Sequence, residues 1–265
     1  MAVIVSWNVA GRVRSVAAQA TALAEREADV VGLQEIRPTA LAAWRHALGE
    51  LGYAHVATSW DEHGAAGRPE PDRRLGVLVA ARSPLAVAAV PAVPWPERLL
   101  AVTTELDGEL VELHNLHVPL SARPGQVKVL TLEAAFAHLA APSPTPRVLV
   151  GDLNTPQYES REGAVQTFAR TRSGRLRPDR GERHDRAELA LVVGLAAHGY
   201  EDAFRSLHGY LQRDRSWVYP NGRAGFRLDH VLVRGLRVEA CEYEHDWRKR
   251  GLSDHAAIWA RVRPR

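Results

Sequence analysis

Short apolar runs of strand length recur along the whole chain, and many of them begin or end at a carboxylate, amide or imidazole side chain. The polar residues that follow such runs are Asn8, Gln34, Glu35, Asn115, His117, Asp152 and Asn154, and those that precede one are Asp229, Ser253, Asp254 and His255. Strands of one sheet bring their ends to common edges, and ligand sites form at those edges. Acids that converge there are costly to bury unless a metal ion or another partner neutralises them. The pattern therefore predicts a sheet protein with one charged site at its strand ends.

Extended and helical patterns alternate along the sequence. Extended runs are expected at 2–6, 29–33, 74–80, 85–90, 99–106, 109–116, 147–150, 216–219, 227–233, 238–243 and 256–262, helices around 13–23, 41–48, 129–139 and 187–198, and loops at 59–73 and 170–186. Asp107-Gly108 is a strong hairpin signal between two of the runs. Adjacent hairpins mixed with strand–helix alternation predict an α/β fold of two sheets with helices outside, in a single domain over residues 1–265.

The composition is that of an ordinary globular protein, with 46% hydrophobic and 25% charged residues in a chain of 265. A domain of this size can fold without disulfides or a structural metal. Cys241 is the only cysteine, which excludes an internal disulfide and a zinc site built on several cysteines. The sequence starts directly in an extended run, and no apolar run approaches the roughly 20 residues that cross a bilayer. We therefore expect a cytoplasmic protein that does not enter a membrane.

The basic residues are almost all arginines. Of 34 basic residues only Lys128 and Lys249 are lysines, which leaves 32 arginines in a chain of formal net charge +3. Arginine makes bidentate contacts with phosphate better than lysine does. A GC-rich coding sequence would produce the same bias together with the many alanines. The arginine excess alone therefore does not predict a phosphate-bearing partner.

Six short motifs occur in the same order in the endonuclease/exonuclease/phosphatase superfamily, which the chain resembles. They are Ser6-Trp7-Asn8, Leu33-Gln34-Glu35, Asn115-Leu116-His117, Gly151-Asp152-Leu153-Asn154, Arg227-Leu228-Asp229-His230 and Ser253-Asp254-His255. Together they extend over nearly the whole chain. The resemblance implies a DNase I-like four-layer sandwich, in which two packed mixed β-sheets are flanked by helices. It also implies hydrolysis of phosphate esters with a bound divalent metal ion.

A metal site is expected because a phosphodiester repels an attacking hydroxide and needs a cation at its phosphoryl oxygens. Glu35 is a hard oxygen ligand of the kind that Mg²⁺ prefers, and Asp254 can add a second carboxylate. The resemblance gives Asn8 a place at the same metal site. The expected cofactor is Mg²⁺ or Mn²⁺.

The candidate catalytic residues are His117, Asp152, Asn154, Asp229 and His255. Asp152 is expected to orient or deprotonate the attacking water, and Asn154, two residues on, shares its face if the strand continues. His255 is expected to contact the scissile phosphate, with Asp229 orienting its ring. The sequence leaves open whether Asp152 or the His255–Asp229 pair is the base.

His117 separates subgroups of the superfamily. Exonuclease III and abasic endonucleases usually have a tyrosine at the corresponding place, whereas DNase I-like and sphingomyelinase-like members have a histidine. His117 shares strand parity with Asn115, so both are expected to face the site while His114 faces away. The alternative is that His117 only caps the strand end before Pro119.

An arginine-rich segment favours a nucleic-acid substrate. The range 161–186 carries eight arginines and four acids, and Arg172, Arg175 and Arg177 are candidate contacts to a phosphate backbone. A solvated loop with arginine bias explains the segment equally well.

A second segment also favours nucleic acid. Trp217, Phe226 and Leu228 match the segment that surrounds a flipped or baseless nucleotide in exonuclease III-like enzymes. Stacking of an aromatic side chain on a base contributes roughly 1–3 kcal/mol. Ser216 stands where related repair enzymes often carry an aromatic residue, and a core hairpin is the alternative interpretation.

These features predict a Mg²⁺- or Mn²⁺-dependent phosphodiesterase that hydrolyses DNA as an exonuclease III-like exonuclease, an endonuclease or both, acting as a monomer in DNA repair. The alternatives within the superfamily are a phosphatase and a phosphodiesterase for inositol phosphates or other small molecules. The alternative from another class is a catalytically silent nucleic-acid-binding relative. The intact set of candidate acids and histidines argues against that last alternative.

Overall fold

The computed structural model describes residues 1–64, 71–120 and 126–265. Its strands are β1 (Ala2–Asn8), β2 (Val30–Ile36), β3 (His55–Thr58), β4 (Gly76–Ala81), β5 (Ala86–Ala88), β6 (Leu99–Leu106), β7 (Glu109–Leu116), β8 (Arg147–Asp152), β9 (Tyr158–Glu159), β10 (Val165–Gln166), β11 (Glu201–Asp202), β12 (Trp217–Val218), β13 (Gly225–Phe226), β14 (Asp229–Arg234), β15 (Leu236–Glu244) and β16 (Ala257–Pro264). Its α-helices are α1 (Val16–Ala24), α2 (Leu41–Glu50), α3 (Ser59–His63), α4 (Val127–Ala140), α5 (Gly181–Val192), α6 (Ala203–His208) and α7 (His245–Lys249). The 3₁₀ helices are η1 (Val13–Ser15), η2 (Pro38–Ala40), η3 (Pro71–Arg74), η4 (Pro96–Arg98) and η5 (Gly194–His198).

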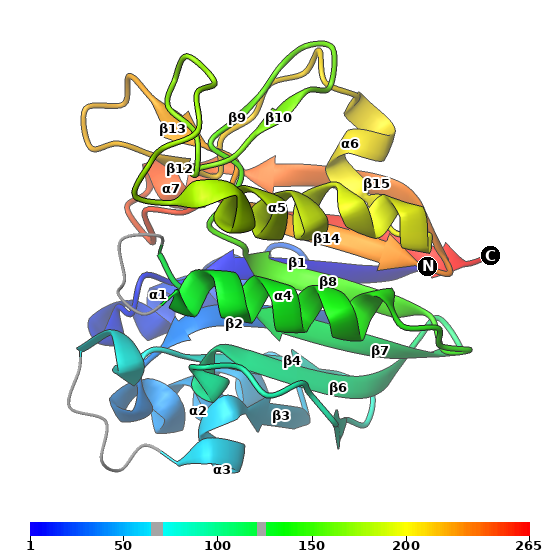
Figure 1. Ribbon diagram of the computed structural model, residues 1–265. Helices are drawn as coiled ribbons and strands as arrows, with labels where there is room; N and C mark the ends of the chain where they lie inside the picture. Colours follow the sequence, from blue (N-terminus) through cyan, green and yellow to red (C-terminus); the bar gives the residue numbers. More distant parts are fainter. Residues whose placement is uncertain (65–70, 121–125) are drawn as a thin grey trace.

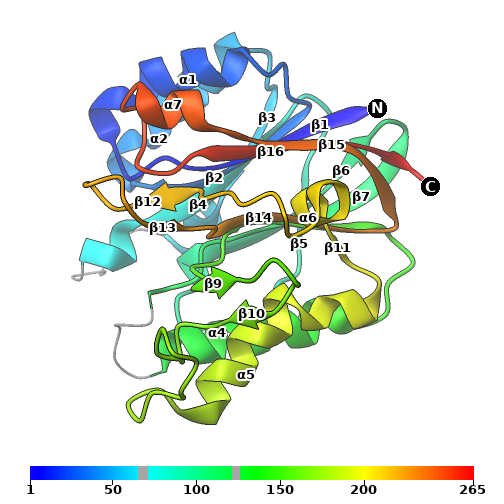
Figure 2. The ribbon, with the colours of Figure 1, turned by 90° about the horizontal axis from the view of Figure 1, so that it is seen from above.

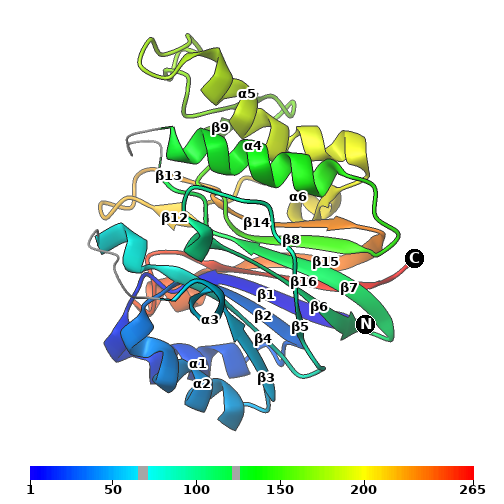
Figure 3. The ribbon, with the colours of Figure 1, turned by 60° about the horizontal axis from the view of Figure 1, so that its bottom comes forward.

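Two six-stranded mixed sheets form the body of the protein (Figure 1). The first sheet has the order β15-β16-β1-β2-β4-β3, and the second has the order β11-β14-β8-β7-β6-β5. One inner pair of each sheet is parallel, β1 with β2 and β7 with β8, and the other neighbours are antiparallel. Figure 3 shows α1 and α2 on the outer face of the first sheet and α4 and α5 on that of the second. The predicted four-layer sandwich is confirmed.

The main hydrophobic core lies between the two sheets. Ile4, Val79, Leu113 and Val231 are among the side chains fully buried there. Burial of this apolar surface is the main free-energy gain that holds the sheets together. At Gly32 the sheets come so close that an added Cβ would lie 2.8 Å from Cγ2 of Val150.

Two further cores lie under the helices and explain the helical periodicity of the sequence. Val16, Ala20 and Leu23 of α1 are buried against the first sheet. On the other side, Leu132 of α4 and Leu191 of α5 are buried against the second sheet. Each helix thus has one apolar face, as the spacing predicts.

The strand directions bring the polar strand ends to one edge. Because β1 and β2 are parallel and β16 runs against β1, the ends of β1 and β2 and the start of β16 lie together. The same holds for the ends of β7 and β8 and the start of β14, where Asp229 pairs in register with Asp152. The hairpin of β12 and β13 lies at the end of the molecule away from the two chain termini (Figures 1 and 2).

Several predicted boundaries differ from the structure. The helix predicted at 187–198 is two elements, α5 and η5, because Val193 leaves helical geometry with φ −122°. Since α5 begins at Gly181, the end of the predicted loop 170–186 is helical. The strand predicted at 85–90 is reduced to β5, and η1 precedes the helix predicted from residue 13.

The predicted loop at 59–73 also contains regular structure. The hydroxyl of Thr58 accepts a hydrogen bond from the backbone of Asp61, and the Asp61 carboxylate accepts one from the backbone of Thr58, so a capping box starts α3. Residues 65–70 of this prediction lie outside the described residues. In the described ranges, no helix has the length and apolar character that crossing a membrane requires.

Candidate functional site

Glu35 leaves the regular path of β2 and faces a cavity. The pairing of β2 with β4 shifts by one residue between Gln34 and Ile36, and Glu35 has φ 62°, in the left-handed region. Bulges of this kind re-aim a side chain, and non-glycine residues are uncommon in this region of backbone conformation. The bulge therefore directs the Glu35 carboxylate into the cavity, which it lines with a side chain that is 24% exposed.

Asp152 and Asn154 also line the cavity, but not on one continuous strand face. The preceding Gly151 has φ 139°, and a Cβ there would lie 1.9 Å from the carbonyl oxygen of Leu116. Only glycine lets β7 and β8 run this close at their ends. The strand ends at Asp152, and Asn154 turns away with φ 49° while its backbone N–H donates to Oδ1 of Asp152 at 2.9 Å. The condition for a shared face, that the strand continues, is therefore not met, and a turn brings Asn154 to the cavity instead.

The cavity has a volume of about 310 Å³. Its lining residues include Glu35, Trp95, Arg98, His117, Asp152, Asn154, Phe168, Trp217, Tyr219, Phe226, Leu228, Asp254 and His255. Most of the candidate site residues thus lie on one surface. Asn8 and Asp229 lie directly behind this lining, where both are fully buried.

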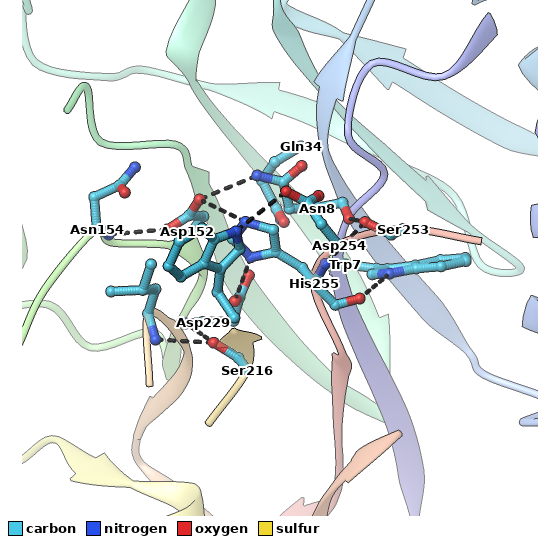
Figure 4. A network of polar contacts seen from close by, with 12 residues as sticks. Trp7, Asn8, Gln34, Asp152, Asn154, Ser216, Asp229, Ser253, Asp254 and His255 are labelled. Atoms are coloured by element: carbon cyan, nitrogen blue, oxygen red, sulfur yellow. Dashed lines mark hydrogen bonds and ion pairs between the residues drawn. The ribbon is translucent and has the colours of Figure 1, made fainter. Parts of the chain in front are cut away.

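Asn8 joins the carboxylates of Glu35 and Asp152, which come from different sheets, and Figure 4 shows its contact with Asp152. Its Nδ2 donates to Oε1 of Glu35 at 3.2 Å and to Oδ2 of Asp152 at 3.0 Å. Its Oδ1 accepts from the backbone N–H of Ala10 at 2.9 Å, and its carbonyl accepts from the Ser253 hydroxyl at 2.6 Å. In this arrangement Asn8 holds the acids, and its own side-chain oxygen is already engaged.

The donor set fits a divalent metal ion. Two carboxylates that share one amide donor form a negative, half-buried pair, and burial of like charges is costly unless a cation is present. Carboxylate oxygens are the ligands that Mg²⁺ and Mn²⁺ prefer. Glu35 and Asp152 are therefore the residues that would hold the ion. Asp254 is exposed, and its Oδ2 accepts from Nε1 of Trp217 at 3.1 Å rather than contacting Glu35 or Asn8.

His255 and Asp229 form a buried pair beside Asp152. Nδ1 of His255 lies 2.8 Å from Oδ2 of Asp229, and Nε2 lies 3.8 Å from Oδ2 of Asp152. Burial alone would lower the pKa of His255, but the charges of Asp229 and Asp152 raise it to about 10. Burial raises the pKa of Asp152. One ligand atom from each of Asp152, Asp229 and His255 lies within 4.8 Å of the other two, which is close enough to hold a metal ion. The Nδ1 atom of His255, however, is already engaged by Asp229.

Three groups that the sequence analysis gave no role hold this pair in place. The Ser216 hydroxyl accepts hydrogen bonds from the backbone N–H of Leu228 at 2.9 Å and of Asp229 at 3.1 Å. The Tyr243 hydroxyl donates to the Asp229 carbonyl at 2.6 Å, and Nε1 of Trp7 donates to the His255 carbonyl at 3.2 Å. Trp7 lies within the motif Ser6-Trp7-Asn8, and Ser216 directly precedes Trp217. Nothing in the sequence singles out Tyr243.

His117 faces the cavity as predicted, and His114 faces away from it. Nε2 of His117 lies 3.8 Å from Oε1 of Glu35 and 3.7 Å from Oδ2 of Asp152. Arg98, which the sequence analysis missed, places Nη1 2.6 Å from Nδ1 of His117. Burial and the Arg98 charge hold the pKa of His117 well below its usual value.

Asn115 does not face the cavity as expected. Its Oδ1 accepts from Nε2 of Gln34 at 2.8 Å, and its Nδ2 donates to the carbonyls of Leu33 and Leu78. All of these partners belong to the first sheet, while Asn115 belongs to the second. The side chain therefore links the two sheets beneath the site.

A buried ion pair lies under the turn that carries Asn154. Nζ of Lys128 donates to the Asn154 carbonyl at 2.7 Å and lies 2.6 Å from Oε1 of Glu188. The other oxygen of Glu188 accepts from the Thr155 hydroxyl at 2.9 Å and from the backbone N–H of Phe168 at 2.8 Å. The Lys128–Glu188 ion pair thus fixes both the turn that carries Asn154 and the segment that carries Phe168, and both of these residues line the cavity.

An aromatic wall closes one side of the cavity. The rings of Trp217 and Phe226 are parallel, with centroids 5.9 Å apart. Phe168 meets Phe226 edge-on at 5.0 Å, and Tyr219 meets Trp217 at 4.8 Å. Leu228 is buried and also lines the cavity. Phe168 and Tyr219 add to the residues predicted from the sequence.

Several arginines of the segment 161–186 form ion pairs, so they are less available to a ligand than the sequence suggests. Its paired arginines are Arg170 with Asp185, Arg177 and Arg180 with Asp179, Arg183 with Glu133 and Arg186 with Glu182. Arg172 and Arg175 are exposed, and no ion pair joins either of them to a described acid. Neither these two nor Arg177 lines the cavity, but Phe168 of the same segment does.

Comparisons with known proteins agree with this fold. Residues 5–255 match the model of the Endonuclease/Exonuclease/phosphatase family. An AP endonuclease from Archaeoglobus fulgidus has a similar fold, with a TM-score of 0.72 and 20% identity over 98% of this chain and 99% of that one. The 3′ phosphatase NExo from Neisseria, bound to a product DNA hairpin, gives 0.67 and 19% over 99% and 100%. TDP2 from D. rerio, complexed with a single-strand DNA product, gives 0.67 and 18% over 99% and 98%. No curated protein matches the sequence.

Proposed function

Because the chain belongs to the endonuclease/exonuclease/phosphatase family, we propose that it hydrolyses phosphate esters with a divalent metal ion, Mg²⁺ or Mn²⁺, and that its substrate is DNA. The observation that carries this proposal is the meeting of Glu35, Asp152 and the His255–Asp229 pair at one cavity. These four groups come from the ends of four separate strands, β2, β8, β14 and β16, and such a convergence of acids has no evident structural purpose.

When bound, the metal ion supplies positive charge at the phosphoryl and leaving oxygens. Glu35 and Asp152 are the residues that hold it. Asp229 engages Nδ1 of His255, so Nε2 is the nitrogen that is left to donate to a phosphoryl oxygen. Because the pKa of His255 is raised to about 10, its ring already carries a proton near neutral pH, so Asp152 is the group at this part of the cavity that takes the proton of the attacking water.

Two features support a nucleic-acid substrate. The aromatic wall of Trp217 and Phe226 offers flat surfaces on which a base can stack beside the acids. Phe168 connects this wall to the segment that carries the exposed Arg172 and Arg175, which can follow a phosphate backbone. The relatives solved with DNA products are consistent with this substrate class.

A phosphomonoester at the end of a DNA strand is the second candidate substrate. A cavity of about 310 Å³ lies at the small end of ligand pockets, and its aromatic wall limits its extent on one side. That size suits a terminal nucleotide better than the middle of a long duplex, and one similar structure is a 3′ phosphatase.

A substrate panel tests the proposal. The same preparation is offered linear duplex, single-stranded DNA, plasmid, an abasic duplex, a 3′-phosphorylated oligonucleotide, RNA and inositol phosphates, each with Mg²⁺, Mn²⁺ or chelator. We expect DNA hydrolysis that depends on metal and falls by orders of magnitude in Glu35→Ala. Glu182→Ala, which removes an exposed carboxylate on α5, is the matched control and keeps full activity.

Three results would overturn parts of the proposal. Hydrolysis of inositol phosphates but not DNA would reassign the substrate. DNA binding without turnover on any substrate would indicate the catalytically silent relative. Full activity of Glu35→Ala would remove Glu35 from the metal site.

We further propose that residues 1–265 act as one domain and as a monomer, in the cytoplasm and in DNA repair. Light scattering of the purified protein at micromolar concentration checks the monomer. Fractionation of the native cells checks the cytoplasmic location. Their sensitivity to abasic damage after deletion of the gene checks the role in DNA repair.

A further inference from the structure

A second group of potential metal ligands lies away from the cavity. Glu112 and His114 project from β7 toward α4, where they meet His138. Nε2 of His114 lies 2.8 Å from Oε1 of Glu112, and Nε2 of His138 lies 3.6 Å from the same oxygen. All three ligand atoms are within 4.8 Å of one another.

The hydrogen bonding of the two imidazoles is unusual. Both Nε2 atoms are buried and lie near Oε1 of Glu112, yet neither makes a well-aligned hydrogen bond to a described residue. The close oxygen of Glu112 therefore lies off the axis along which each ring directs a proton or lone pair. Buried polar atoms nearly always have partners, so two that converge without one call for an explanation.

We propose that Glu112, His114 and His138 bind one transition-metal ion of the Zn²⁺ type. Two imidazole nitrogens and one carboxylate oxygen suit Zn²⁺, whereas Mg²⁺ prefers oxygen ligands throughout. His114 is 1% exposed and His138 is 24% exposed, so the site is walled on one side and reachable from solvent on the other. Zinc sites with three protein ligands bind water at the fourth position.

Arg147 supports this arrangement from behind. Its Nε donates to the second oxygen of Glu112 at 3.0 Å, which leaves Oε1 for the ion. Its Nη1 donates to the carbonyls of His138 and Ala141 at the end of α4. Partners of this kind fix the orientation of ligating carboxylates. A bound ion would therefore fasten the end of α4 to β7, which is a structural role separate from hydrolysis.

Metal binding by matched variants tests the site. Chelator-treated wild-type protein, His138→Ala and the control His46→Ala, which removes an exposed histidine of α2, are titrated with Zn²⁺ by calorimetry and with Co²⁺ by visible absorption. We expect His138→Ala to bind one Zn²⁺ fewer per chain than the other two proteins. The thermal unfolding midpoint should rise less with Zn²⁺ in this variant.

The readouts separate this site from the catalytic one. His138→Ala should keep its Mg²⁺-dependent hydrolysis. Any Zn²⁺ bound at Glu35 and Asp152 is counted equally in wild type and in the variant, so it does not affect the difference between them. Glu112→Gln provides a second variant, because it removes one ligand charge while it keeps the side-chain shape. Equal Zn²⁺ counts and equal Co²⁺ spectra in wild type and His138→Ala would overturn the proposal.

Discussion

The Nζ atom of Lys128 donates a hydrogen bond of 2.7 Å to the carbonyl oxygen of Asn154, so a buried cation holds the turn that follows Asp152. In Lys128→Met the buried Glu188 carboxylate loses its lysine partner and keeps the contacts with Thr155, Phe168 and His184. Since breaking a buried ion pair is strongly destabilising, we expect a loss of about 3–5 kcal/mol in the free energy of unfolding. Urea unfolding measures this loss. The double variant Lys128→Met with Glu188→Gln should regain most of the stability and still turn over slowly, because the Asn154 carbonyl lacks its donor. A wild-type kcat in the double variant would show that the lysine only balances charge.

The hydroxyl of Ser216 fixes Asp229 through two backbone N–H groups. Ser216→Ala leaves both groups without this acceptor, which costs about 1–3 kcal/mol of stability. Because Asp229 orients His255, we also expect kcat to fall about tenfold or more, in line with the cost of misplacing a catalytic group. Steady-state kinetics at saturating metal measure it. Ser206→Ala on α6 is the control, and equal kcat values for the two variants would refute a positioning role.

Acid should weaken the protein through Glu159. Burial opposes ionisation, but the charge and hydrogen bonds of Arg227, with a hydrogen bond from Arg205, lower the pKa of Glu159 to about 2. A carboxyl whose folded pKa lies below its unfolded value of about 4.3 stabilises the protein fully above that value, by about 3 kcal/mol. This contribution is lost as the pH falls from about 5 toward 2. Urea midpoints at successive pH values should therefore fall less steeply in Glu159→Gln. Glu182→Gln should keep the wild-type slope, and a wild-type slope in Glu159→Gln would contradict the assignment.

Neutralising Arg172, Arg175 and Arg177 together should weaken DNA binding and reduce its dependence on salt. If all three contact phosphates, the slope of log K against log salt falls in magnitude by about 2 to 3. Fluorescence anisotropy with a labelled duplex at several salt concentrations measures it. The matched control neutralises three arginines outside this segment, namely Arg237 near the start of β15 and Arg263 and Arg265 near the C-terminus. Equal slopes in the two triple variants would assign the segment to a solvated surface.

The sequence predicted the architecture because its strands are nearly continuous apolar runs, and runs that are buried on both faces are easy to recognise. It located the strand ends that carry Asp152, Asp229 and His255 for the same reason. Short elements escaped prediction since they depend on local contacts, as α3 depends on the capping box of Thr58 and Asp61.

The finer geometry of the site could not be predicted because it depends on contacts between distant residues. Strand parity suggested that Asn115 faces the cavity, but hydrogen bonds from the opposite sheet hold it between the layers. The bulge at Glu35 and the turn at Asn154 both need left-handed backbone, which Glu seldom adopts and which Asn adopts too rarely for the residue type alone to predict it. In the sequence, Lys128 stands out only as one of two lysines. Its structural role becomes evident only from its contact with Glu188 in the folded protein.

Asn8, Glu35 and His255 are carried by the first sheet, whereas His117, Asp152 and Asp229 are carried by the second. The relative placement of these groups is therefore set by how closely the two layers approach, as at Gly32, where no room exists for even a methyl group. A substitution there would spread the reacting groups apart without altering any of them. The rate of turnover therefore also depends on residues that do not contact the substrate. The residues that line the cavity are only part of those that determine this rate.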